Sequence, residues 1–232
     1  MPSLSRTLRS PATRVVVLAL LGLGSLHIAW GSLSYFEAGV LHPFLLEKLP
    51  LPAADAWLFA VRLHVVAAAF ALPACLALLS RRLVGARPRV HRWLGRATGV
   101  VVVAALVPSG GYLAFFATGG LPSTAGFLLS GAVVFLAMWR AIRAVRERDF
   151  VAHRRFTAHV AAQLSVAVTS RALLVLFHLC GIDAELAYIV ALWIPVVASA
   201  LFVEFARTAP MQPKRRSSGE VAPVHLAFDP AR

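Results

Sequence analysis

The sequence predicts an all-α integral membrane protein: a bundle of six transmembrane helices with both termini in the cytoplasm. Of its 232 residues, 59% are hydrophobic and 14% are charged, and the mean hydropathy is +0.76. The apolar residues form six stretches, each close to the roughly 20 residues that cross a bilayer. The Lys and Arg residues gather between alternate stretches, as they do in cytoplasmic loops.

The composition also excludes several classes of protein. A soluble domain is about 45–50% apolar and about 25% charged, so this chain has more apolar surface than one core of its size can bury. The net charge of +13 would suit nucleic acid, but the basic residues flank apolar runs instead of forming one patch. We therefore expect the lipid bilayer and its anionic headgroups as partners, and no nucleic acid. Cys75 and Cys180 form no metal or redox motif.

The chain divides into three parts. A basic cytoplasmic segment, residues 1–14, precedes a transmembrane domain over residues 15–207. Residues 208–232 are rich in Pro, Ser, Lys and Arg, which predicts a disordered cytoplasmic tail. Within the transmembrane domain, short segments with Pro or Gly separate several of the apolar stretches. The expected spans cover roughly residues 15–36, 56–79, 95–117, 123–143, 157–180 and 185–206.

Two spans have distinctive features. The first is expected to remain as a helix and not to be cleaved as a signal peptide, because no small-x-small site follows it. Trp30, Tyr35 and Phe36 at its end are typical of an interfacial anchor. The third contains Pro108-Ser109-Gly110-Gly111, which predicts a kink or an opening of that helix.

The positions of the positive charges orient the bundle. With six spans, 20 of the 23 Lys and Arg residues lie on one side of the membrane, and Lys48 is the basic residue of the opposite connections. The positive-inside rule assigns the basic side to the cytoplasm. We expect a multi-pass protein of the bacterial inner membrane.

The fifth span carries a polar stripe, and ionisable groups at membrane depth are candidate functional groups. A rise of 1.5 Å per residue places His27, His64 and Arg171 at one level of the bilayer, where no carboxylate accompanies them. A buried Arg171 then needs an anionic ligand or, structurally, backbone carbonyls and water. Gln163 and His178 share the stripe as weaker candidates, and His27 suits a core histidine equally well.

Two similar motifs lie near the cytoplasmic ends of the third and fifth spans. His91-Arg92-Trp93-Leu94-Gly95-Arg96 opens one, and His153-Arg154-Arg155-Phe156 opens the other, with His159 deeper in the helix. The arginines and aromatic residues suit anchoring in the headgroups. Alternatively, histidines of the two helices meet as ligands of a metal or haem iron. The candidate binding residues here are His91, Arg92, Arg96, His153 and Arg154, with His159 as a weaker one.

These motifs resemble an uncharacterised bacterial membrane-protein family, the domain of unknown function 2306 (DUF2306), over about residues 55–180. The resemblance rests on His64, HRWLGR at 91–96, GFLL at 126–129, the stretch 139–156 and Arg171. It implies a multi-span protein in which these His and Arg positions recur, and it brings no established activity. Roles for His27, His159 and His178 do not follow from it.

Three functions remain open from the sequence. The first is a redox protein that binds b-type haem or quinone. Haem iron would be held by His64 with His27 or His178, or by His91 with His153 or His159, while Arg171 contacts a propionate or a quinone oxygen. The second is a transporter of a small anionic or neutral solute, and the third is a non-enzymatic assembly or interaction protein. Motifs of hydrolases and P-loop enzymes are not present, and whether the protein is an enzyme stays open.

Overall fold

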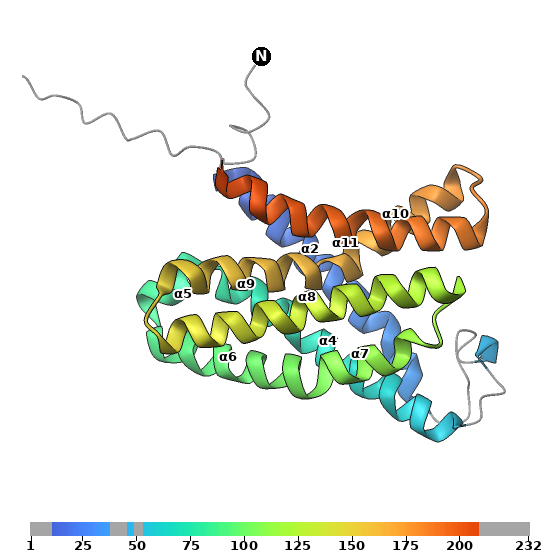
Figure 1. Ribbon diagram of the computed structural model, residues 1–232, viewed down its shortest axis with the longest axis horizontal. Coiled ribbons are helices and arrows are strands. Elements are labelled where there is room, and N and C mark those ends of the chain that lie inside the picture. The colour runs from blue at the N-terminus through green and yellow to red at the C-terminus, as the bar shows by residue number, and fades with distance from the viewer. Residues whose placement is uncertain (1–10, 38–45, 49–52, 209–232) are drawn as a thin grey trace, which may run out of the picture.

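The protein is a bundle of long helices (Figure 1), described by a computed structural model over residues 11–37, 46–48 and 53–208. Every regular element in these residues is a helix, as predicted. The elements are α2 (Pro11–Gly31), η1 (Ser32–Phe36), α4 (Ala54–Leu78), α5 (Arg81–Ala86), α6 (Pro88–Val101), η2 (Val102–Leu106), α7 (Val107–Ala114), α8 (Gly120–Arg146), α9 (Phe150–Leu164), α10 (Val166–Leu179) and α11 (Ala184–Thr208).

Six of these helical segments are long and apolar enough to cross a membrane, which confirms the six predicted spans. They are Val15–Phe36, Ala54–Leu78, Pro88–Ala114, Gly120–Arg146, Phe150–Leu179 and Ala184–Glu204. The third and fifth begin seven residues earlier than expected. Their first turns are rich in Arg, whose long side chains let a helix continue beyond the hydrocarbon core. The predicted N-terminal segment and C-terminal tail lie largely outside the described residues.

The third span is irregular where the sequence predicts a break. It passes from α6 through the π-helical segment η2 into α7, directly before Pro108. Proline has no N–H to donate to the preceding turn, and a π segment absorbs the resulting mismatch within a continuous helix. The Ser109 hydroxyl donates to the carbonyl of Ala105, at 2.6 Å, and so satisfies one backbone acceptor beside the break.

The fifth span differs from the prediction, because it is not one regular helix. α9 and α10 meet at Ser165, whose hydroxyl donates to the Ala161 carbonyl at 2.7 Å. The Thr169 hydroxyl donates in turn to the Ser165 carbonyl, at 3.1 Å. Serine and threonine side chains that bond the preceding turn bend helices. The break gives α10 a different direction from α9, as Figure 1 shows.

Small residues form much of the interior. Ala67 and Ala71 of α4, Ala137 of α8 and Ala161 of α9 are buried, together with Val102 of η2. Such residues let helix backbones approach closely, which is how helices associate in lipid. Large apolar side chains such as Trp30, Leu121 and Leu179 are exposed instead, as expected of a surface that faces acyl chains.

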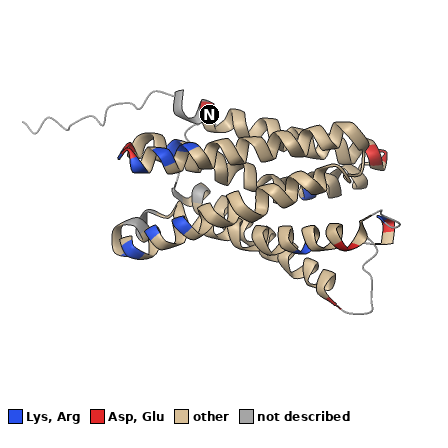
Figure 2. Cartoon of the chain, turned by 60° about the horizontal axis from the view of Figure 1, so that its bottom comes forward, with Lys and Arg blue, Asp and Glu red and all other residues tan. Residues whose placement is uncertain are grey.

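The charged residues are distributed unevenly along the bundle. Lys and Arg gather at one end, and acidic residues are prominent at the other (Figure 2). The basic end holds the start of α6 and the turn from α8 to α9. The start of α2 and the end of α11 lie at this same end (Figure 1), as an even number of spans requires. That this end is cytoplasmic stays a prediction.

Candidate functional site

A cavity of about 500 Å³ lies inside the bundle, among α2, α4, α7, α8, α9, α10 and α11. Most of its lining is apolar, and several polar side chains reach it from different helices. Small-molecule sites are typically cavities of about 300–1,000 Å³ with this combination of walls. The polar side chains that line it include Ser25, Ser32, Tyr35, Lys48, His64, Ser130, Gln163, Ser170, Arg171 and Tyr188.

His64 reaches the cavity from α4 and contacts the break in the third span. Its Nδ1 lies 3.2 Å from the Ser109 hydroxyl oxygen. That hydroxyl has one proton, which goes to the Ala105 carbonyl at 2.6 Å. The oxygen therefore accepts from Nδ1–H, and Nε2 of the neutral ring keeps its lone pair for another partner.

Gly110 allows this close approach. A Cβ atom at this position would lie 2.9 Å from Cε1 of His64 and 3.2 Å from its Nδ1. Atoms in van der Waals contact are about 3.5–4.0 Å apart, so a side chain would displace the imidazole. The irregular third span thus provides both the hydrogen-bond partner of His64 and the space for its ring.

Arg171 lines the same cavity from α10, so the structure brings the two main candidates to one site. Its guanidinium donates to the Ala167 carbonyl at 2.8 Å and is close enough to His64 and Tyr188 for electrostatic interaction. The expectation that Arg171 is buried is wrong, because the residue is exposed. It takes part in none of the ion pairs formed by the described residues.

Lys48 is a site residue that the sequence analysis did not select. It lines the cavity, its side chain is 14% exposed, and its Nζ donates to the Thr118 hydroxyl at 2.9 Å. Glu47, which is largely exposed, lies 3.6 Å from the same Nζ. One feature of the sequence could have indicated Lys48: it is the basic residue of the connections on the side opposite the arginine-rich loops. No Asp or Glu occurs among the described residues that line the cavity.

Gln163 lines the cavity as well, but both ends of its amide are occupied. The side chain is 2% exposed, its Nε2 donates to the Val196 carbonyl at 3.0 Å, and its oxygen accepts from the Ser130 hydroxyl at 3.0 Å. Gln163 therefore ties α9 to α8 and α11 across the cavity wall.

His27 and His178 do not reach the cavity. Both are exposed, neither is among the described residues that line it, and His178 uses its Nδ1 on the Leu174 carbonyl at 2.8 Å. The structure does not bring either imidazole to the cavity wall where His64 lies, because each is exposed on its own helix. The predicted pairings of His64 with His27 or His178 are therefore not supported.

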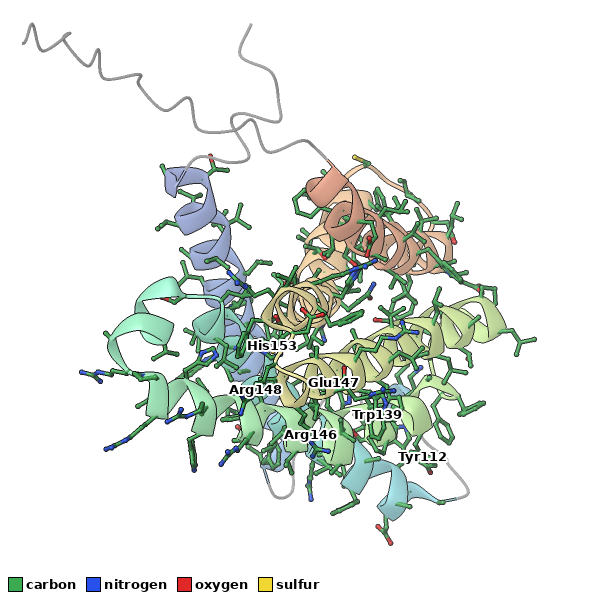
Figure 3. All side chains as sticks on the ribbon, turned by 60° about the vertical axis from the view of Figure 1, so that its left-hand side comes forward. Tyr112, Trp139, Arg146, Glu147, Arg148 and His153 are labelled. Atoms are coloured by element: carbon green, nitrogen blue, oxygen red, sulfur yellow. The ribbon has the colours of Figure 1, made fainter. Side chains whose placement is uncertain are left out.

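The structure does bring together His91 and His153 at the basic end of the bundle. Their side chains are close enough for electrostatic interaction. His153 lies near the α8–α9 turn (Figure 3), and its Nδ1 donates to the Ala141 carbonyl of α8 at 2.9 Å. The Nδ1 of His91 is buried and has no hydrogen-bond partner within the described part of the chain.

His159 belongs to a different cluster. Its Nε2 lies 2.6 Å from Oε1 of Glu204, and Arg155 donates to both oxygens of that carboxylate at 2.9 Å. The pair of His159 with His91 is thus not formed. The sequence analysis did not connect Glu204 with Arg155 or His159, because 45 or more residues separate them along the chain.

The remaining candidates, Arg92, Arg96 and Arg154, are exposed and do not line the cavity. Arg154 donates from Nε to the Phe150 carbonyl of its own helix at 3.1 Å. Their exposure suits contact with anionic headgroups. Within the described residues, no group of three or more His, Cys, Asp or Glu side chains could hold a metal ion.

Six apolar spans around a mainly apolar cavity define a multi-pass membrane protein with an internal cavity. The chain belongs to the DUF2306 family of predicted membrane proteins, whose family model matches residues 61–206. This match confirms the family resemblance and includes His64, both His-Arg motifs and Arg171. No curated protein and no solved structure gives a significant match.

Proposed function

We propose that the protein binds an apolar small molecule with a hydrogen-bonding oxygen head in the cavity between His64 and Arg171. One observation is the main support: these two side chains, from α4 and α10, line one cavity of about 500 Å³. The apolar walls would take the body of the ligand, and the two polar groups would orient its head.

The hydrogen-bonding atoms of Arg171 and His64 determine which chemical group the head of the ligand can be. Arg171 donates hydrogen bonds and accepts none, so it suits a carbonyl, carboxylate or phosphate oxygen. Nε2 of neutral His64 accepts a hydrogen bond, and the same atom donates when the ring is protonated. A quinone carbonyl fits Arg171, and a quinol hydroxyl can donate to Nε2 of neutral His64. A carboxylate also fits Arg171, and it can accept from His64 only when the ring is protonated. A bound quinone would make the site a redox site.

A haem held by two histidines does not fit this cavity. His64 is the single histidine among the described residues that line it, whereas six-coordinate b-type haem needs a second imidazole. The inner pair of His91 and His153 stays a prediction for haem iron. An absorption spectrum of protein purified after haem-sufficient expression tests it, because a missing Soret band would exclude haem at that pair.

Ligand binding can be measured through Trp57, a buried residue of the cavity wall. Titration of the detergent-purified protein with decylubiquinone should quench tryptophan fluorescence saturably. Arg171→Gln should weaken binding about tenfold or more, since a hydrogen bond to a charged group contributes about 1.5–3 kcal/mol. His64→Gln should weaken it about two- to tenfold, since a bond between neutral groups contributes about 0.5–1.5 kcal/mol. Arg171→Lys keeps the charge and reports whether the planar guanidinium matters.

The matched control is Arg62→Gln. Arg62 is also an arginine of a membrane-spanning helix, but its Nε donates to the Tyr35 carbonyl at 3.0 Å and it does not line the cavity. This variant should bind as the wild type does. Saturable quenching that is unchanged in both His64→Gln and Arg171→Gln would refute the assigned site, and so would the absence of binding by every oxygen-headed apolar probe.

Transport of such a molecule is the second candidate function. The cavity follows α4 from Trp57 to Leu72, about 22 Å at 1.5 Å per residue, which is a large part of the roughly 30 Å hydrocarbon core. It also borders the irregular third span, where Gly110 and Gly111 line it. Proteoliposomes should then release a trapped solute in a manner that depends on Arg171, and equal release by Arg171→Ala would remove that residue from the route.

A further inference from the structure

We infer that the ligand is a single-chain anionic amphiphile whose carboxylate lies between Lys48 and Arg171 and whose chain runs along α4 toward Leu72. This inference rests on the proposed function, because it names the class of ligand that the cavity binds. It differs from the quinone alternative in the charge of the head.

The first argument is the charge of the lining. Lys48 and Arg171 both line the cavity, and the described lining residues include no Asp or Glu. A cation that lines a cavity and has no acidic partner is available to an anionic ligand, and Arg171 is such a cation although the residue is exposed. Glu47 compensates Lys48 from the exposed side, at 3.6 Å, and no acidic side chain pairs with Arg171 in the described residues. An anionic head would supply the missing charge.

The second argument is that the two cations lie toward the same end of the cavity. Tyr188 interacts electrostatically both with Arg171 and with Glu47, the residue next to Lys48. Tyr188 itself lines the cavity, so its phenol is a third polar group at that end. A carboxylate has two oxygens, which can accept from an ammonium and a guanidinium at once.

The third argument is the shape and polarity of the rest of the cavity, beyond the two cations. From Trp57 to Leu72 the lining of α4 extends over about 22 Å, with Val65, Ala68 and Ala69 between them. At the deeper end, Gln163 is held at both ends of its amide, by the Val196 carbonyl and the Ser130 hydroxyl, and it carries no charge. A long space with a cationic end and apolar walls matches one extended hydrocarbon chain with an anionic head.

The test is direct binding of radiolabelled palmitate to the full-length protein in a neutral detergent, measured by scintillation proximity. Palmitate should bind saturably, and hexadecanol, which has the same chain without the charge, should compete at least tenfold more weakly. Phosphatidylglycerol, an anionic lipid with two chains, should also compete at least tenfold more weakly. Equal competition by either compound would overturn the inference.

Variants of Lys48, the second cation of the site, distinguish a role in ligand binding from a role in packing. Lys48→Gln should weaken palmitate binding at least tenfold, Lys48→Arg should restore it to within about threefold, and the control Arg62→Gln should leave it unchanged. Wild-type affinity in Lys48→Gln would overturn the role of Lys48. Loss in Lys48→Arg equal to that in Lys48→Gln would show a packing role instead, and would also overturn it.

The outcome for the wild type distinguishes this inference from the proposed function. If decylubiquinone binds and palmitate does not, the cavity binds a ligand but not this class, and only the present inference fails. If neither compound binds, both fail.

Discussion

Replacing Gly110 by alanine tests whether the imidazole of His64 lies against the backbone of α7. The new Cβ would lie 2.9 Å from Cε1 and 3.2 Å from Nδ1, so the ring must move by several tenths of an ångström. That movement stretches the 3.2 Å contact with the Ser109 hydroxyl. Overpacking of this kind costs about 1–3 kcal/mol of unfolding free energy, and a lost hydrogen bond adds about 0.5–1.5 kcal/mol.

Gly111→Ala is the matched control, because a Cβ at the neighbouring position meets no atom within 4 Å. Both variants gain about 1 kcal/mol from the higher helix propensity of alanine, so that gain cancels in the comparison. The remaining difference of about 1.5–4.5 kcal/mol corresponds to a melting temperature about 3–18 °C lower for Gly110→Ala, at about 2–4 °C per kcal/mol for a chain of this size. Differential scanning fluorimetry in detergent measures it.

A second comparison assigns the difference to the imidazole. In a His64→Ala background the ring is absent, so Gly110→Ala and Gly111→Ala should melt at similar temperatures. Two outcomes would refute the reasoning: equal melting temperatures in the wild-type background, or a penalty for Gly110→Ala that persists without His64. Decylubiquinone binding should also weaken in Gly110→Ala, because the displaced ring no longer occupies its position at the cavity.

Three further predictions concern other parts of the bundle. Glu204→Gln removes the carboxylate that joins α9 to α11, so it should lower the melting temperature more than Glu147→Gln, which breaks an exposed pair within one stretch of helix; equal shifts would contradict this. Gln163→Leu should destabilise the protein by about 1–3 kcal/mol, more than Ser130→Ala, because it removes two hydrogen bonds that join α9 to α8 and α11, whereas Ser130→Ala removes one; chemical denaturation compares the two, and a smaller loss for Gln163→Leu would argue against those bonds. Reporter fusions at both termini should be active only in the cytoplasm, and periplasmic activity of either would reject the predicted orientation.

Composition and charge were sufficient to predict the six spans, because the bilayer imposes a length and a polarity on each helix. The break in the third span was also predictable, since proline followed by two glycines is a local signal. The break at Ser165 was not, although the hydroxyls of Ser165 and Thr169 bond carbonyls of the preceding turn there. Serine and threonine also occur in many straight helices. Whether a helix bends at one of them depends on which backbone carbonyl the hydroxyl bonds, and the sequence does not give this.

The candidate site was predictable to the extent that depth along a helix decides it. His64 and Arg171 line one cavity, and equal depth in the bilayer was the argument that paired them. Depth does not give the direction in which a side chain points, and for this reason His27 was placed with them although it is exposed. Lys48 was missed because it lies in a connection, whose path over the bundle no periodic pattern encodes.

The hydrogen bonds of the two cations predict which of them matters more for a ligand. Lys48 already donates to Thr118 and pairs with Glu47, so part of its charge is compensated without a ligand. Arg171 donates to the carbonyl of Ala167, lines the cavity and takes part in none of the ion pairs of the described residues. A guanidinium presents its donors as a rigid fork, so it can bind an oxygen head while keeping that backbone bond. Arg171→Gln should therefore weaken palmitate binding more than Lys48→Gln does, and the reverse order would place the head nearer Lys48 than the arginine.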